Sequence, residues 1–316
     1  MPLTVDHVEG CPDLGPECAG PRPPVAYRHH VDELVAQTSF DASLDLTSWL
    51  GLDLHASIRL VKVDPTYSEL DGTPKSVPND IHHHNELTGG VGDPWLLARV
   101  GAVAGDFVTV ARAGLSFPVG RTVEDPYELG REGEWHEHLQ EGTGTFVPIL
   151  GAGFAYRIAP VTIALGGTAF FNAYENAKRF RAAPRLYVNH RVSVSFLDGV
   201  LTPFVEATFA HEGEEYWHGQ IGGEGSNVRS EIYLGGGLGW RMDDTWSLEG
   251  SASGRLASLT DAPTFESAGT FSLAVAATFD LWDTDEERAA RAAAEEPVVP
   301  GIIEHEHDGV VEFEKR

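Results

Sequence analysis

Histidines and glutamates, the residues most able to bind a metal ion, are concentrated in two short stretches of this sequence. Residues 133–146 read GEWHEHLQEGTGTF, and residues 82–86 read HHHNE. In an extended backbone, side chains two residues apart point to the same side, so each stretch presents one pair of imidazoles. Neutral imidazoles and carboxylates are ligands for Zn(II) and Cu(II). The candidate metal ligands are His82, His84, Glu86, His136 and His138.

A second interpretation of both stretches stays open. Polar surface loops carry histidines for hydrogen bonds that fix the loop, without binding any ion. A weaker metal candidate is HEHD at 305–308, and calcium is a further alternative at the carboxylate-rich loops, although no Asp-x-Asp-x-Asp-Gly spacing occurs. Zn or Cu is therefore the one cofactor class that the sequence indicates.

The motifs of common enzymes are missing from the chain. There is no Gly-x-Ser-x-Gly, no His-Glu-x-x-His and no P-loop. The glycine-rich stretch GGEGSN at 222–227 leads into a strand pattern rather than a helix, which argues against a phosphate site. The sequence predicts a protein that is not an enzyme.

The composition narrows the class of partner. The chain has 48 Asp and Glu against 22 Lys and Arg, a net charge of −26, which argues against a nucleic-acid surface because phosphates need clustered cations. Cys11 and Cys18 lie close together in CPDLGPECAG, which we interpret as a small disulfide loop formed in an oxidising compartment. A reduced pair, a redox dithiol and a metal dithiol are the alternatives.

The hydrophobic period is two over most of the chain. In FSLAVAATFDLW (271–282), every odd position is apolar and the other face is largely polar. The same alternation predicts eleven strands, at 33–46, 50–63, 94–103, 106–118, 145–158, 160–173, 185–196, 201–211, 231–241, 246–256 and 271–282. A twelfth strand is expected near 24–31, although the prolines at and before its start weaken it.

Strand length and loop length together indicate a membrane barrel. These strands run about 10 to 14 residues, near the roughly 9–11 that a tilted strand needs to cross a bilayer, whereas globular strands average about 5–6. Short turns alternate with long polar loops, as in barrels of the bacterial outer membrane. No run of roughly 20 apolar residues offers a transmembrane helix. We therefore predict an all-β transmembrane antiparallel up-and-down barrel of about 12 strands, surrounded by outer-membrane lipid, with its long loops outside the cell.

The polar face of the strands carries both signs of charge. In a closed barrel this face lines the lumen, where opposite charges pair across the interior, whereas in a soluble sandwich it would face bulk water. The residues expected in the lumen are Asp53, Arg59, Arg99, Arg112, Arg157, Arg191, Glu206, Glu231, Arg241, Glu249 and Arg255. His190 is the exception, because its position in the alternation places it on the lipid side.

Three regions follow from this pattern. Residues 1–23 form an N-terminal extension with the expected disulfide loop, 24–282 form the barrel, and 283–316 form an acidic tail. The tail begins DTDEERAARAAAEE, a short charged helix, and continues into a flexible segment. On the periplasmic side it would be available to a periplasmic partner.

Several short motifs resemble a known family of barrels. The run HHHNELTGGVGDPWLLARV (82–100) is followed by ARAGLSFPVGRT (111–122) and by a strand after GTGTF. This resembles the outer-membrane family named for the meta pathway of phenol degradation, in which a Gly-Asp pair opens a strand and a Gly-Leu-x-hydrophobic-Pro-x-Gly segment ends one. Gly92-Asp93 and Gly114 to Gly120 match. The resemblance, over roughly 31–282, implies a barrel with a transport-like role for small hydrophobic or aromatic compounds, and the histidine-rich loops are not part of it.

The expected function is a channel or transporter-like barrel for a small solute or metal ion. Its lumen charges would form a polar constriction and its outer loops would gate or capture the ligand. A barrel of this size is filled partly by its own side chains, which favours a narrow path or a plugged lumen over wide diffusion. The alternative function is a non-conducting structural or adhesion barrel that acts through its loops or tail, and a soluble β-protein is the third interpretation.

Overall fold

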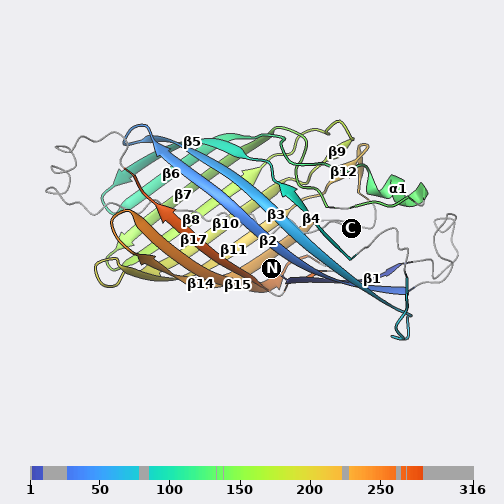
Figure 1. The fold of residues 1–316 in the computed structure, drawn as a ribbon. Coiled ribbons are helices and arrows are strands. Elements are labelled where there is room, and N and C mark those ends of the chain that lie inside the picture. The colour runs from blue at the N-terminus through green and yellow to red at the C-terminus, as the bar shows by residue number, and fades with distance from the viewer. Residues whose placement is uncertain are drawn as a thin grey trace.

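The computed structural model is built almost entirely from antiparallel strands (Figure 1). It describes residues 2–9, 27–77, 85–132, 134–137, 139–222, 228–260, 265–267 and 269–279. The expected disulfide at Cys11 and Cys18 and the tail from residue 283 lie outside the described residues.

One large sheet forms the body of the molecule. Its members are β1 (Pro2–Glu9), β2 (Tyr27–Asp45), β3 (Leu50–Ser68), β4 (Glu86–Val91), β5 (Trp95–Ala104), β6 (Phe107–Ser116), β7 (Val147–Ile158), β8 (Val161–Phe170), β10 (Arg185–Val194), β11 (Leu201–Glu212), β14 (Arg229–Arg241), β15 (Trp246–Ser258), β16 (Phe265–Ser267) and β17 (Thr270–Ala277). β4 and β5 both pair with β3 and are parts of one strand interrupted at 92–94, and β16 and β17 are likewise parts of the last strand. The wall therefore has twelve strands in this description, and neighbours in the sheet are neighbours in sequence.

The first strand closes the barrel and corrects the sequence prediction. β1 pairs with β2, from Pro2↔Leu34 to Glu9↔Tyr27, and also with β16, from Leu3↔Ser267 to Val5↔Phe265. The twelfth strand is thus β1, whereas the segment expected at 24–31 contributes the beginning of β2. Pro2–Glu9, which the sequence analysis places in an N-terminal extension, therefore lies in the barrel wall. The prediction failed here because β1 is short and its pairing with β16 joins opposite ends of the chain, which no local pattern reports.

The connections alternate in length, as the sequence predicts. Short connections at one end of the barrel are 46–49, 105–106, 159–160, 195–200 and 242–245. Long connections at the other end include 69–85, 117–146, 171–184 and 213–228. We refer to the two ends as the short-turn end and the long-loop end.

Two small elements organise the long-loop end. The loop 117–146, the β6–β7 loop, contains a short helix, α1 (Pro126–Glu132). A separate small sheet pairs β12 (Tyr216–Trp217) with β13 (Gln220–Ile221) and with β9 (Phe180–Arg181), so it ties the 171–184 loop to the 213–228 loop (Figure 1). Within the described ranges, no helix is long and apolar enough to cross a membrane.

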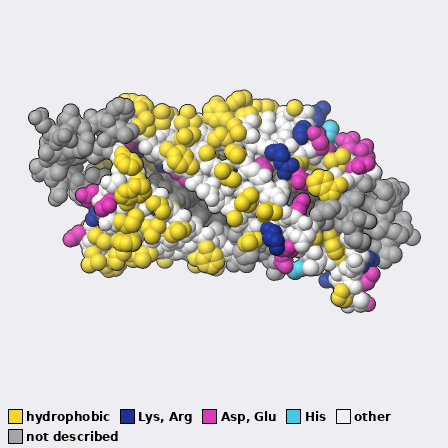
Figure 2. Space-filling model, viewed as in Figure 1, with side chains coloured by type: hydrophobic (Ala, Val, Ile, Leu, Met, Phe, Trp, Pro, Cys, Tyr) yellow, Lys and Arg dark blue, Asp and Glu magenta, His cyan; other side chains and the backbone are white. Residues whose placement is uncertain are grey.

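The outer face of the wall is apolar and exposed. Large apolar side chains at alternate positions point outward; they include Leu34, Phe40, Leu54, Ile58, Leu60, Leu96, Val100, Leu115, Leu150, Phe154, Leu186, Val205, Leu234, Leu238, Phe271, Leu273 and Val275. Figure 2 shows hydrophobic side chains spread over the strand region, with charged side chains toward both ends and most of them toward the end that carries α1. Soluble monomers rarely expose apolar patches of more than a few hundred Å². This surface is that of a barrel embedded in lipid.

Exposed aromatic residues mark both ends of the apolar band. Those near the short-turn end are Trp49, Phe107, Phe196, Trp240, Trp246 and Phe279, and those near the long-loop end are Phe117, Phe146 and Phe171. Aromatic girdles of this kind lie at the two membrane–water interfaces of outer-membrane barrels. His190 is exposed on the outer face, where its position in the alternation predicts it to be.

The core of the molecule lies inside the barrel, because the outward side chains are exposed. One buried apolar cluster, which we call the lumen cluster, consists of Leu97, Val147, Ile149, Phe170, Tyr187, Ala210 and Tyr233. A second cluster joins Val31, Val35, Val61 and Val63 of the wall to Leu139 of the β6–β7 loop. That loop therefore enters the barrel.

Candidate functional site

A network of four charged side chains faces the lumen from β2, β3, β5 and β6. The Asp53 carboxylate accepts hydrogen bonds from Nε of Arg99 at 3.0 Å and from Nε of Arg112 at 2.9 Å. It also accepts one from the Ser43 hydroxyl at 2.8 Å, and Arg99 Nη2 donates to Asp45 at 2.7 Å. Asp53 is buried, so its charge is stabilised by two guanidinium groups rather than by bulk water. These hydrogen bonds hold three of the predicted lumen residues, Asp53, Arg99 and Arg112, on one side of the lumen.

Further pairs lie on the other side of the lumen. Arg191 on β10 donates to Glu249 on β15 at 2.6 Å, although β11 and β14 lie between these strands in the sheet, and its guanidinium lies 3.4 Å from the ring centroid of Phe204. Arg255 donates to Glu231 at 3.0 Å. These contacts hold charged groups over the interior surface of several strands.

Three predicted lumen residues have different surroundings. Arg157 and Glu206 are half-buried at inward positions of β7 and β11. Arg241 is exposed near the short-turn end and donates from Nη2 to the carbonyl oxygen of Asp198 at 2.6 Å. Arg241 therefore supports a turn rather than a constriction.

Arg59 holds the β6–β7 loop inside the barrel. Its Nη2 donates to the Glu141 carboxylate at 3.2 Å and to the carbonyl oxygen of Gln140 at 2.8 Å. Arg59 is 3% exposed and Glu141 is 2% exposed. A buried pair of this kind stays charged only when both partners remain in place. Arg59 is a predicted lumen residue, but its partner comes from the loop rather than from another strand.

Asp93 anchors both halves of the same loop. It lies in the interruption between β4 and β5, where its Oδ1 accepts hydrogen bonds from the backbone N–H of Val119 at 3.0 Å and of Gly120 at 2.7 Å. Its Oδ2 accepts from the N–H of Thr143 at 2.7 Å and from the Thr143 hydroxyl at 2.9 Å. One carboxylate thus joins the start and the end of the loop, and the break in the strand makes that carboxylate available.

Close backbone contacts explain the glycines beside this anchor. A Cβ added to Gly120 would lie 2.6 Å from the carbonyl oxygen of Glu141, and one added to Gly142 would lie 2.5 Å from Asp93 Oδ1. Any larger residue would push the loop away from the Asp93 carboxylate. The Gly-Asp pair and the Gly-Leu-x-hydrophobic-Pro-x-Gly segment noted in the sequence therefore serve to seat this loop.

The lumen cluster occupies part of the barrel interior. It draws its side chains from β5, β7, β8, β10, β11 and β14 and includes three aromatic residues, of which Phe170 and Tyr187 have ring centroids 6.1 Å apart. Beside it lies a cavity of about 50 Å³ lined by loop and wall residues, among them His55, Arg59, Trp95, Glu141 and Arg185. A water molecule needs a cavity of roughly 10–15 Å³, so this cavity has room for a few water molecules.

The predicted metal ligands are only partly described. Glu86 is the first residue of β4 and is half-buried. His136 is buried in the β6–β7 loop, with Nδ1 3.0 Å from the carbonyl oxygen of Glu134. His82, His84 and His138 lie outside the described residues, so a metal site on these five residues stays a prediction.

The described residues contain a group of neighbouring side chains of metal-ligand type that the sequence does not reveal. Asp125, Glu128 and His218 bring one ligand atom each to within 4.8 Å of one another. Asp125 and Glu128 lie in the β6–β7 loop and His218 lies in the 213–228 loop, so no local spacing links them. The only local signal is the acidic residue directly before Pro126, typical of a helix N-terminus.

Comparisons with known proteins support the fold. No family model and no curated protein matches the chain. Among solved structures, an outer membrane channel from Pseudomonas putida F1 aligns with a TM-score of 0.51 at 13% identity, over 88% of this chain and 94% of that chain. Salmonella typhi OmpF in complex with daunomycin aligns with a TM-score of 0.32 at 9% identity, over 80% of this chain and 88% of that chain. The chain has the fold of an outer-membrane β-barrel, and the predicted fold class is confirmed.

Proposed function

We propose that this protein is a channel or transporter-like barrel of the bacterial outer membrane, and that it passes a small solute through a narrow lumen. The observation that carries the proposal is the β6–β7 loop, which Asp93 and Arg59 hold inside the barrel mouth. Porin-type channels restrict their lumen with inserted segments and fixed charges, and a purely structural wall has no need of either.

The lining of the cavity favours a solute with an apolar or aromatic body and a polar group. The His55 ring stacks on Trp95 at 4.9 Å, and the Arg185 guanidinium lies 4.9 Å from the centroid of Phe170. Flat rings and guanidinium planes bind aromatic compounds well. The resemblance to the phenol-degradation meta-pathway family points to the same solute class.

The charged residues below the cavity would select among permeating molecules. Beyond the lumen cluster, a solute meets the network of Asp53, Arg99 and Arg112 and then the Arg191–Glu249 pair. Because both signs are fixed on the wall, the path would favour dipolar or neutral solutes over ions of a single sign.

Permeation measurements test the proposal. Purified protein in planar bilayers and in liposomes should pass small aromatic compounds more readily than sugars of the same mass. Phe170→Ala, which shortens a side chain of the lumen cluster, should raise conductance, and the outward-facing Phe117→Ala should leave it unchanged.

One outcome favours a different function. The lumen cluster fills part of the barrel, which is the observation that supports a non-conducting structural or adhesion barrel. If neither the unmodified protein nor Phe170→Ala conducts any solute, the channel proposal is wrong and the non-conducting barrel replaces it.

The histidine-rich loops add a second part to the proposal, the binding of Zn(II) or Cu(II) at His82, His84, Glu86, His136 and His138. The support for it is the spacing of the residues and their expected position outside the cell. Calorimetric titration should lose heat of binding when the four histidines are changed to Ala. An unchanged isotherm would remove them as ligands.

A further inference from the structure

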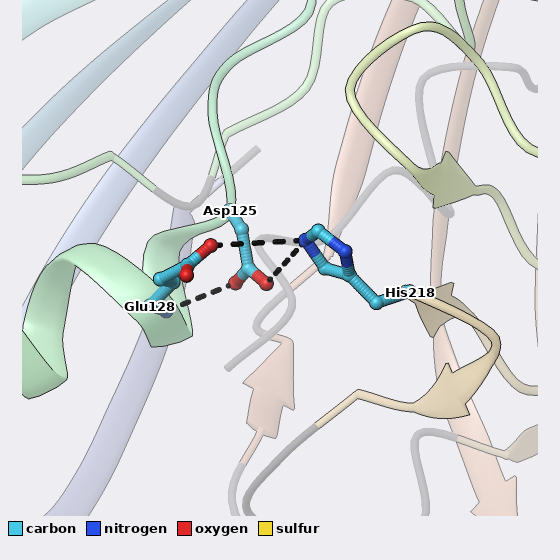
Figure 3. A group of neighbouring side chains, drawn as sticks. All are labelled: Asp125, Glu128 and His218. Atoms are coloured by element: carbon cyan, nitrogen blue, oxygen red, sulfur yellow. Dashed lines mark hydrogen bonds and ion pairs between the residues drawn. The ribbon is translucent and has the colours of Figure 1, made fainter.

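A histidine and two carboxylates face one another between two loops at the long-loop end (Figure 3). His218 Nε2 lies 3.5 Å from Asp125 Oδ2 and 3.8 Å from Glu128 Oε2. All three ligand atoms lie within 4.8 Å of one another. With the imidazole neutral, the group carries two negative charges and one aromatic nitrogen donor.

The two carboxylates are positioned by the local backbone. Asp125 Oδ1 accepts hydrogen bonds from the N–H of Tyr127 at 2.8 Å and of Glu128 at 3.1 Å, so it caps the first turn of α1. Its Oδ2 then points toward His218, and Glu128 lies on the same turn (Figure 3). The Asp125 side chain is 9% exposed, so its orientation is fixed by burial as well as by the cap.

The histidine is positioned by the small sheet of the loops. His218 follows β12, has a left-handed φ of 53°, and donates its backbone N–H to the carbonyl oxygen of Arg179 at 2.9 Å. Few side chains adopt this backbone conformation, and it directs the ring toward α1. His218 and Gly219 (φ 75°) form the two-residue turn between β12 and β13, and the pairing of β12 with β9 sets where that turn lies.

The charged neighbours of the group are already paired. Arg179 donates to Glu175 at 2.5 Å, and Lys178 lies 3.1 Å from Glu124. These ion pairs cancel their own charges, so the net charge of the group comes from its own carboxylates, Asp125 and Glu128.

We propose that Asp125, Glu128 and His218 bind a divalent transition metal ion of the Zn(II) type, which links the β6–β7 loop to the 213–228 loop. Zn(II) binds imidazole nitrogen and carboxylate oxygen at about 2.0–2.2 Å in tetrahedral geometry, which separates the ligand atoms by roughly 3.3–3.5 Å. The two distances from His218 need little or no contraction to reach that geometry. Ca(II) needs six to eight oxygen ligands, so this mixed group of three does not suit it.

The proposed ion has a structural consequence and an open position. Three protein ligands leave a fourth position for water or a solute group, as in other Zn(II) sites with three protein ligands. The ion would also hold the mouth of the barrel, because one of the linked loops is the loop anchored inside the lumen. The inference is independent of conductance and of the metal site proposed at His82, His84, Glu86, His136 and His138, since it involves none of these five residues.

The test compares metal binding by two matched histidine variants of the full chain in detergent micelles. His218→Asn removes the imidazole and keeps a residue that tolerates a positive φ. The control is His190→Asn, on the lipid-facing surface. Zn(II) stoichiometry and affinity are measured by competition with a chromophoric chelator at neutral pH, and Co(II) absorption reports the ligand geometry.

In His218→Asn we expect one equivalent of bound Zn(II) to be lost, or its affinity to fall by more than the roughly 10–100-fold that changing an outer-shell residue costs. His190→Asn should bind Zn(II) as the unmodified protein does. Glu128→Gln should weaken the same equivalent, and because Glu128 is exposed and does not cap the helix this variant leaves the fold intact. Equal stoichiometry and affinity in the unmodified protein, His218→Asn and Glu128→Gln would overturn the proposal. The three side chains would then link the two loops without an ion.

Discussion

The two ends of the lumen differ in where their side chains come from. Toward the short-turn end, the charged groups belong to the wall itself: Arg99, Arg112 and Asp53 lie on adjacent strands, and Arg191 reaches Glu249 across two intervening strands. Toward the long-loop end, the wall residues Arg59 and Asp93 bind the β6–β7 loop instead. The alternating side chains of the strands line the lumen. A constriction that can move or be removed needs a segment that is not part of the strands.

The two ends of the lumen also differ in how much their charged contacts contribute to stability. The Arg191–Glu249 pair of the wall is partly exposed to lumen water, with both side chains 24% exposed, so it contributes modestly to stability. The Arg59–Glu141 anchor of the loop is buried, so its charges are costly to leave unpaired, and the half-buried Asp93 accepts four hydrogen bonds from the loop. Changes at the long-loop end should therefore affect both stability and permeation more than changes at the short-turn end.

The largest effect is expected from Asp93→Ala. Its carboxylate accepts four hydrogen bonds from the loop, and hydrogen bonds to a charged group contribute about 1.5–3 kcal/mol each. Their joint loss should release the loop, raise single-channel conductance and expose the loop to protease. Asp71→Ala is the matched control, because the Asp71 carboxylate bonds to Thr73 within its own turn. If Asp93→Ala conducts as the unmodified protein does, the loop is not the constriction.

A somewhat smaller effect is expected from Arg59→Met. Removing one partner of a buried ion pair costs roughly 3–5 kcal/mol, because the Glu141 carboxylate loses its guanidinium. Thermal unfolding in detergent should show the loss, and the double variant Arg59→Met/Glu141→Met should recover much of it. No recovery in the double variant would show that the two side chains are not coupled.

A smaller effect on stability, but a clear one on selectivity, is expected from Arg191→Gln. The Arg191 and Glu249 side chains are each 24% exposed, so the pair contributes about 1 kcal/mol or less. Loss of the positive charge should shift the reversal potential in a salt gradient toward cation selectivity. Glu249→Gln should shift it the other way, and two shifts of the same sign would place the pair outside the conducting path.

The smallest effect is a response to acid in the 171–184 loop. The hydrogen bond from Arg179 lowers the pKa of Glu175 below its ordinary value of 4.5. A lowered pKa means that the contact stabilises the loop at higher pH and is lost as the pH falls through the pKa of the folded state. The protection of amides around Arg179, measured by hydrogen exchange relative to the intrinsic rate at each pH, should therefore fall as the pH drops below 4.5. Glu175→Gln should show the low protection at every pH, and an acid response that survives in this variant must come from another group.

Much of the fold was predictable because alternation is a local property. Each of the eleven predicted strands has a counterpart in the sheet, from 33–46 in β2 to 271–282 in β17. The same alternation predicts that Arg99, Arg191 and Glu249 face inward. The twelfth strand was misplaced because β1 is short and is specified by pairing with β16 rather than by its own pattern.

The candidate sites were less predictable because they join distant segments. The motif around Asp93 was visible, but its use as an acceptor for Gly120 and Thr143 depends on how the loop returns to the wall. His218 was visible as one histidine among several, and nothing in the sequence linked it to Asp125.

The sequence by itself determined the period, the number of long strands, the apolar outer face and the charged inner one, since these follow from the identity of every second residue. The tertiary structure decided which strand closes the barrel, which loop enters the lumen and which carboxylates meet His218. These depend on hydrogen bonds and ion pairs between residues far apart in the chain, and such contacts form only after the strands have brought their loops to one end of the barrel.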